Sequence, residues 1–207
     1  MLLYPLPARL LALNTLTLGA LTLGAAAAAP AKFEVASASE NLNVMTVESE
    51  TAVENFTGRT SKIRGTLTFD PVARTGSGTV TVDGSSIDTG IANRNGHMNS
   101  AAWLNFSKAP EVKFTATRVS RVSGDTYRVA GTLTMNGVTR PVTADATVRY
   151  TPASAATREA GLKGNVLAVS TRFDVKLSDY GVKNGQITAG RVSDQLAITV
   201  RFVASDK

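Results

Sequence analysis

The stretch that decides the fold is GTLTMNGVTRPVTADATVRY, which runs from Gly131 to Tyr150. At its centre is Asn136-Gly137, the residue pair that best tolerates the positive φ angles of a type I′ two-residue turn. Apolar residues alternate with mostly polar ones on both sides of the turn, which is the period-two pattern of half-buried strands. The stretch therefore predicts an antiparallel β-hairpin with one face in the interior and the other in water.

The inward face of this hairpin combines large and small side chains. Leu133 and Met135 precede the turn, and Val142 and Ala144 follow it on the same face. Arg140 shares this face but lies beside the turn, where its charged head can reach water, so an apolar ligand with a polar end would fit there. The pattern alone leaves two alternatives open, a closely packed core and the wall of a cavity.

Similar alternation recurs along the chain and predicts an antiparallel barrel or sandwich of about eight strands with no long helix. An irregular strand is expected at 43–48, and a break in phase predicts a β-bulge near Thr117 and Arg118. Small residues at inner positions favour a cavity, the alternative being that they fit a taper or a sharply curved corner. These small residues are Gly65, Ala116, Gly131, Ala144 and Ala146.

Two long connections interrupt the alternation. Residues 88–110 contain the only tryptophan, Trp103, and the only histidine, His97, and they suit short helical turns. A connection of this length in a compact domain is typical of a functional loop or lid. The second connection, residues 151–164, is polar and predicts an excursion on the surface.

The first 29 residues differ from the rest of the chain. They contain one charged residue, Arg9, followed by an apolar run and an alanine tract that ends at Pro30. This order predicts a secretory signal peptide over residues 1–29 and one exported domain over residues 30–207, located in the periplasm or cell envelope or secreted. The alternative is a membrane anchor, but threonines and glycines dilute the apolar run and no basic cluster follows it.

The composition and motifs of the chain exclude several classes of function. The formal net charge is +6, but the cations are scattered singly with few aromatic neighbours, which argues against a nucleic-acid groove. The absence of cysteine excludes disulfides, thiolate metal sites and a lipid anchor on cysteine. His97 has no recognisable catalytic partners, and no catalytic or phosphate-binding motif is present. We therefore expect no enzymatic activity, no cofactor and no metal, with a structural role for His97.

Several segments, in order and spacing from about Gly58 to Phe202, resemble the YceI family. The most specific are Asn93–His97 with the downstream aromatic residue and Lys-Ala-Pro, the hairpin LTMNGVTRPV, and Ser178–Val182. The resemblance implies an elongated, lipocalin-like β-barrel with an apolar tunnel that binds an isoprenoid or another long-chain lipid without catalysis. It favours the cavity over the packed core. The stretch at 41–60 is more acidic and less aromatic than the first strand of that family.

The tunnel implied by this resemblance assigns ligand contacts to inward-facing residues. They are Ile63, Leu67, Phe69, Val82, Trp103, Phe114, Leu133, Met135, Val142, Ala144, Phe173, Leu177 and Ile198. The expected partner is a long-chain lipid such as a polyisoprenoid, with no nucleic acid and no stable membrane span after signal cleavage. A homodimer is compatible with the sequence, which does not set the oligomeric state. The alternative function is a stress-related envelope scaffold with a small or empty cavity.

Overall fold

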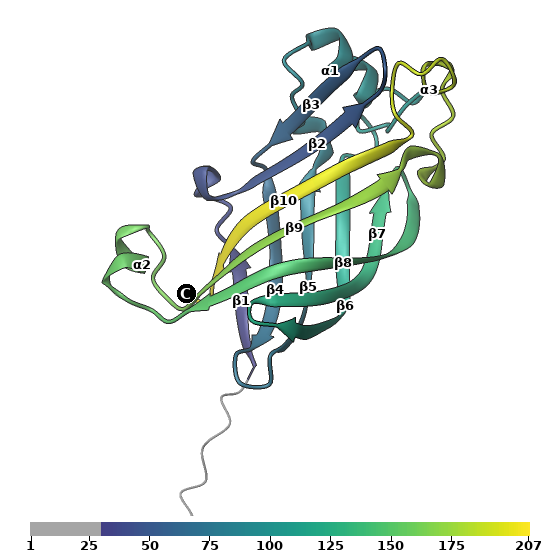
Figure 1. The fold of residues 1–207 in the computed structure, drawn as a ribbon. Helices are drawn as coiled ribbons and strands as arrows, with labels where there is room; N and C mark the ends of the chain where they lie inside the picture. The colour runs from purple at the N-terminus through teal and green to yellow at the C-terminus, as the bar shows by residue number, and fades with distance from the viewer. Residues whose placement is uncertain (1–29) are drawn as a thin grey trace, which may run out of the picture.

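The computed structural model describes residues 30–207, so the predicted signal peptide lies outside the described residues. Ten strands form one continuous antiparallel sheet, accompanied by short helices (Figure 1). The strands are β1 (Ala31–Val35), β2 (Val44–Glu50), β3 (Asn55–Thr60), β4 (Ile63–Asp70), β5 (Thr75–Asp83), β6 (Glu111–Ser123), β7 (Thr126–Met135), β8 (Val138–Thr151), β9 (Val166–Lys176) and β10 (Gln195–Ser205). The helices are α1 (Ala92–Asn99), α2 (Ala155–Glu159) and α3 (Gly185–Thr188), and the 3-10 turns are η1 (Glu40–Leu42), η2 (Gly84–Ser86) and η3 (Leu177–Tyr180).

Eight of these strands close into a barrel, in the order β1-β4-β5-β6-β7-β8-β9-β10, with β1 pairing back to β10. The closing pairs are Glu34 with Ser205 and Val35 with Ala204. Farther along β10, β2 takes the place of β1, and β3 extends the wall beyond it. The prediction of an antiparallel barrel of about eight strands is confirmed. The expected strand at 43–48 is β2, whereas β1 and β3 escaped sequence analysis.

The junction between β1 and β2 is held by the side chain of Asn43, which is 1% exposed. Its Nδ2 donates to the carbonyl oxygen of Ala36 at 2.9 Å, and its Oδ1 accepts from the amide of Val203 on β10 at 3.2 Å. One amide side chain, immediately before β2, therefore bonds the backbone of the segment after β1 and that of β10.

The hairpin of β7 and β8 has the predicted geometry. Asn136 and Gly137 have φ angles of 50° and 74°, so the two-residue turn is confirmed. β8 pairs with β9 only from Ala146 onward, leaving the first half of β8 without a partner on that side. Pro141, which has no N–H to offer, lies in this unpaired half. β8 and β9 therefore diverge toward the turn, and we call the gap between them the wedge. At its wide end, the Asn136 side chain donates to the carbonyl oxygen of Tyr180 at 3.0 Å.

Close approach between strands explains two of the small inner residues. A Cβ atom on Gly65 would lie 2.3 Å from the carbonyl oxygen of Thr79, and one on Gly131 would lie 2.2 Å from that of Thr115. These glycines fit sharply curved corners, which was the alternative to a cavity. The predicted bulge is confirmed, because the register between β6 and β7 shifts between Ala116 and Arg118.

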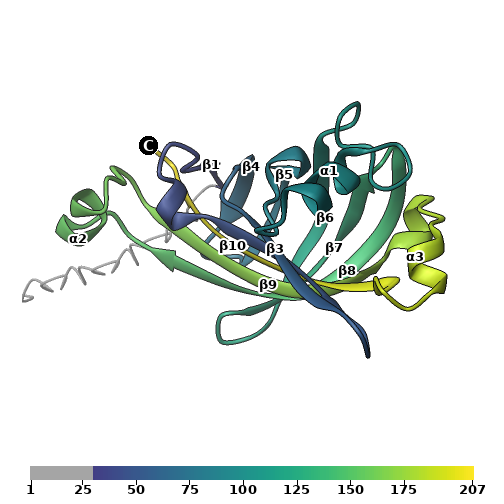
Figure 2. The same cartoon turned by 90° about the horizontal axis from the view of Figure 1, so that it is seen from above.

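Aromatic side chains fill the end of the barrel where β1 and β4 meet. Phe69 packs edge to face on Tyr127 with ring centroids 5.9 Å apart, and Phe33 packs in the same manner on Tyr150 at 6.4 Å. Phe33 and Tyr127 are completely buried. The opposite end carries α1, α3 and the tip of the β2–β3 hairpin (Figures 1 and 2). No helix among the described residues is both long and apolar enough to traverse a bilayer.

Candidate ligand-binding cavity

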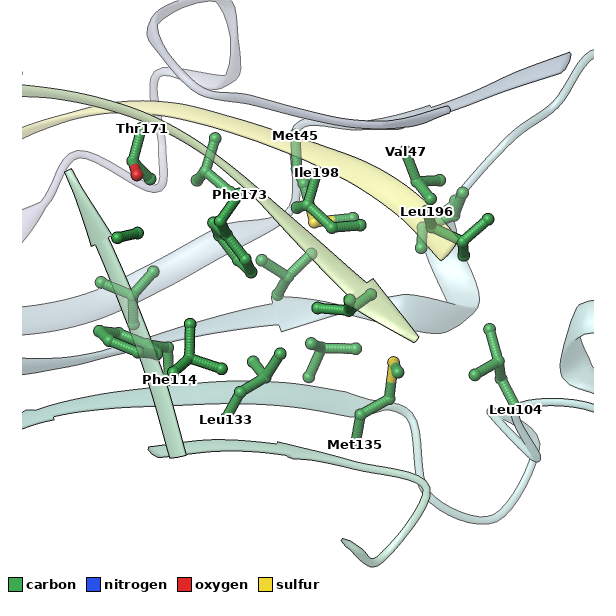
Figure 3. A pocket seen from close by; sticks show the side chains of 18 of the residues that line it. Met45, Val47, Leu104, Phe114, Leu133, Met135, Thr171, Phe173, Leu196 and Ile198 are labelled. Atoms are coloured by element: carbon green, nitrogen blue, oxygen red, sulfur yellow. The ribbon is translucent and has the colours of Figure 1, made fainter. Parts of the chain in front are cut away.

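The interior of the barrel contains a cavity of about 740 Å³. This volume lies within the range of about 300–1,000 Å³ that is usual for small-molecule sites. Side chains from opposite walls, such as Phe114, Leu133, Phe173 and Ile198, converge on it (Figure 3). Every lining residue that belongs to a strand is uncharged. The hydroxyl of Thr171, one of the few polar groups in the wall, donates to the carbonyl oxygen of Asp145 at 2.9 Å.

The structure brings together around this cavity all of the predicted site residues except one. Those in the lining are Leu67, Phe69, Val82, Trp103, Phe114, Leu133, Met135, Val142, Ala144, Phe173, Leu177 and Ile198. Their role as ligand contacts stays a prediction.

The assignment of Ile63 to the lining was wrong. Ile63 is the first residue of β4 and is only 1% exposed, but it packs within the hydrophobic core and does not reach the cavity. Alternation correctly placed it on the inner face. An inner face, however, includes residues that other core side chains cover, and alternation does not separate these from a cavity wall.

The lining also contains residues that were not predicted as site residues. Met45 and Val47 come from β2, whose strand was expected, and Phe56 comes from β3, whose strand was not. Ile87 and Phe106, from the connection between β5 and β6, also line the cavity. Alternation of Met45 and Val47 was a usable signal for β2, whereas the inward positions in the connection follow no period.

Charged side chains line the cavity only at one end. Glu54 comes from the β2–β3 connection, Arg94 from α1, and Arg191 from the segment after α3. The segment before α3 also meets the segment after α1, since Asn184 Nδ2 donates to the carbonyl oxygen of Ala102 at 3.2 Å. We call this end, lined by Glu54, Asn93, Arg94, His97, Asn184, Gln186 and Arg191, the mouth of the cavity.

Arg140, which sequence analysis placed at a polar rim, does not line the cavity. Its Nε donates to the carbonyl oxygen of Asp179 at 2.9 Å, which binds the start of β8 to η3 across the wedge between β8 and β9. His97 does line the mouth and is exposed. Among residues 30–207 its imidazole makes no hydrogen bond, so the expected structural role has no contact to support it.

Arg94 is the most enclosed charged group of the mouth, with a side chain that is 20% exposed. Its Nη2 donates to Oε1 of Glu54 at 2.6 Å. Its guanidinium also lies over the ring of Phe56, 4.3 Å from the ring centroid. α1 is thereby attached to β3 at the rim of the cavity.

The loop that carries α1 is fixed to the barrel wall by Asp88. Its backbone forms an antiparallel bridge with Arg59 of β3. Its Oδ1 accepts from Asn95 Nδ2 at 2.7 Å and from the amide of Gly90 at 2.8 Å. These hydrogen bonds, first that from Asn95 and then that from Gly90, hold the pKa of the Asp88 carboxyl below its ordinary value. The predicted functional loop is thus an ordered wall of the mouth.

The arrangement of the site suits an amphiphile. Uncharged walls can accept an apolar chain, and the donors and charges of the mouth can accept a polar end. Within the described residues there is no cluster of three or more histidine, aspartate or glutamate side chains that could hold a metal ion.

The sequence of this chain matches a known domain family and a curated relative. The YceI-like domain family matches residues 31–204. A UPF0312 protein of Pectobacterium atrosepticum is 49% identical over 67 residues, which is 32% of this chain and 34% of that protein. In that alignment the chain therefore spans about a third of the length of its curated relative.

Two solved structures share the fold. The crystal structure of Burkholderia cenocepacia BcnA superposes with a TM-score of 0.68 at 22% identity, covering 80% of this chain and 98% of that one. A polyisoprenoid binding domain from Saccharophagus degradans, implicated in plant cell wall breakdown, superposes with a TM-score of 0.59 at 17% identity. This match covers 86% of the present chain and 99% of that domain.

Proposed function

Since the chain belongs to the YceI-like domain family, we propose that it is a binding protein that holds a polyisoprenoid or another long-chain lipid inside its barrel. The observation that carries this proposal is the cavity, whose strand walls are uncharged and whose charged groups are confined to one end. The name of the Saccharophagus degradans domain, which shares the fold, is in line with it.

The size of the cavity supports a chain of moderate length. At about 30 Å³ for each group of the size of a water molecule, a cavity of about 740 Å³ holds roughly 25 such groups. An isoprenoid of about 20 carbons with a small polar head fits within this volume.

We expect the protein purified from its host to carry lipid. Extraction into organic solvent followed by mass spectrometry would identify the lipid, and the stripped protein would then be titrated with geranylgeraniol. Trp103, the only tryptophan, lines the cavity, so its fluorescence reports on filling. A wild-type protein that releases no lipid and does not bind geranylgeraniol would contradict lipid binding and favour the scaffold alternative.

We further propose that the barrel acts outside the cytoplasm, because residues 1–29 have the order of a signal peptide. Amino-terminal sequencing of the protein from the envelope or medium should begin between Ala28 and Lys32. Recovery of the chain with Met1 intact from a membrane fraction would contradict removal of the segment.

A further inference from the structure

The oxidisable sulfur of this chain is gathered in the wall of the cavity. The sequence contains no cysteine and four methionines, of which Met45, Met98 and Met135 line the cavity. These three residues come from β2, α1 and β7, which are not consecutive in the chain. Met45 and Met135 lie on opposite walls, and their side chains extend into the space between the walls (Figure 3). A lipid chain that fills the cavity therefore passes between two thioethers.

Two of these sulfur groups are shielded from bulk solvent. Met45 is 4% exposed and Met135 is 6% exposed, whereas Met98, which follows His97 of the mouth, is half-buried. A peroxide converts a thioether to a polar sulfoxide when the two groups meet. A water-soluble peroxide reaches Met98 directly but has little access to the other two. The enclosed sulfurs are therefore available mainly to a peroxide that is carried into the cavity by its own apolar chain.

The wall does not need methionine in order to be apolar. Leucine has a similar volume and packs elsewhere in the same lining, for example at Leu133 and Leu196. Methionine adds flexibility and a polarisable thioether, and only the thioether accepts an oxygen atom. All three methionines of residues 30–207 lie where a bound chain contacts that group. This placement favours a role for the thioether itself.

We propose that the barrel reduces hydroperoxides of the lipid it holds, with Met45, Met98 and Met135 as oxygen acceptors. The activity rests on the proposed lipid-binding function and adds a reaction to it. Isoprenoid chains are unsaturated and form allylic hydroperoxides with oxygen, so the oxidant is a lipid hydroperoxide that enters as the ligand. Each sulfur reacts once, and one barrel therefore consumes at most three equivalents.

The reaction is the transfer of one oxygen atom. A sulfur lone pair attacks the terminal oxygen of the hydroperoxide, and the O–O bond breaks. The proton on the transferred oxygen passes to the oxygen that stays on the lipid. The lipid leaves as an alcohol, the methionine becomes a sulfoxide, and two electrons have moved from sulfur to the peroxide.

Enclosure should accelerate this transfer. A chain held against the sulfurs converts a bimolecular step into an effectively unimolecular one. The comparison is with tert-butyl hydroperoxide, which has the same reacting group but no chain to fill the cavity. At equal concentration, Met45 and Met135 should be oxidised about ten-fold or more faster by the hydroperoxide of geranylgeraniol. Met98 is the internal reference, because it should react with both compounds.

The experiment uses protein purified from its host, stripped of lipid and incubated without oxygen with either hydroperoxide. Trypsin places the three methionines in separate peptides, residues 33–59, 95–108 and 129–149. Mass spectrometry of these peptides measures the sulfoxide, and chromatography of the extracted lipid measures the alcohol. The two should form in equal amounts, up to three equivalents for each barrel.

Two variants separate the cavity from the surface. The double variant Met45→Leu, Met135→Leu removes the enclosed thioethers and nearly conserves side-chain volume. At a lipid concentration that saturates the fluorescence of Trp103, it should form at most one equivalent of alcohol. Ala144→Phe, which places a ring in the cavity, should slow the oxidation of Met45 and Met135 by the lipid hydroperoxide by about ten-fold. The same variant should leave the oxidation of Met98 by tert-butyl hydroperoxide unchanged.

The outcomes separate the two proposals. Failure of the wild type to bind geranylgeraniol would contradict lipid binding itself. Binding of the lipid hydroperoxide without sulfoxide at Met45 or Met135 would leave lipid binding intact and overturn the reduction. Equal rates with the two hydroperoxides would show that these sulfurs react without help from the cavity, which also overturns it. The same result follows if the double variant forms as much alcohol as the wild type.

Discussion

Ala144→Phe is expected to remove most lipid binding while leaving the barrel folded. Ala144 lies in the middle of β8, and its methyl group faces the cavity. A phenyl ring at this position crosses the path of an extended chain, so the affinity for geranylgeraniol should fall by about ten-fold or more. Because the cavity can accommodate the ring, the free energy of unfolding should change by less than about 1 kcal/mol, against roughly 1–3 kcal/mol in a close-packed core.

The measurements are titration with geranylgeraniol and urea unfolding, on Ala144→Phe and on Thr143→Phe. Thr143 is the preceding residue of β8 and faces the solvent, so Thr143→Phe adds the same ring to the same strand outside the cavity. It should bind lipid as the wild type does. A large loss of stability in Ala144→Phe, or equal lipid binding in the two variants, would refute the cavity as the lipid site.

Asn43→Ala is expected to have the largest effect on stability, about 3 kcal/mol. The substitution leaves the amide of Val203 and the carbonyl group of Ala36, both in half-buried residues, without their side-chain partner. An unsatisfied polar group costs about 1–3 kcal/mol when it is buried. Two half-buried groups are affected here, so about 3 kcal/mol is expected for the pair. Urea unfolding monitored by circular dichroism measures the change.

Asn41→Ala is the control for this substitution. Asn41 lies two residues earlier, in η1, is exposed, and makes no side-chain hydrogen bond within residues 30–207. Its replacement should change the free energy of unfolding by less than about 0.5 kcal/mol. Similar midpoints for Asn43→Ala and the wild type would mean that water replaces the lost hydrogen bonds and that the junction does not depend on Asn43.

The barrel could be predicted from the sequence because its long strands repeat a strict alternation. The turn at Asn136-Gly137 fixed the register of β7 and β8, and alternation placed Leu133, Phe173 and Ile198 on one face. β1 and β3 were missed for a physical reason. They are short, and their side chains include Lys32, Glu34 and Arg59. β1 also pairs only with strands distant in the sequence, β4 and β10.

The mouth could not be predicted from local pattern. Glu54, Phe56 and Arg94 meet through tertiary contacts between a hairpin tip and a helix, and none of them follows a period that signals a common site. The rim was expected at Arg140, the only charged residue on the inner face of the hairpin. Alternation gives the side of the sheet on which a residue lies, but not the neighbour that binds its charged head, which for Arg140 is the backbone of η3.

Closure of the barrel through β1 and β10 has a consequence for the order of folding. Glu34 pairs with Ser205, so the contact that completes the ring joins segments separated by all the other strands. Such a contact carries a high cost in loop-closure entropy, and topologies rich in such contacts fold slowly. A chain that emerges from the ribosome or a translocation pore without β10 is an open, curved sheet with its apolar face in water. The closed cavity is therefore the last part of the molecule to form, and a lipid can be enclosed only by a fully synthesised chain.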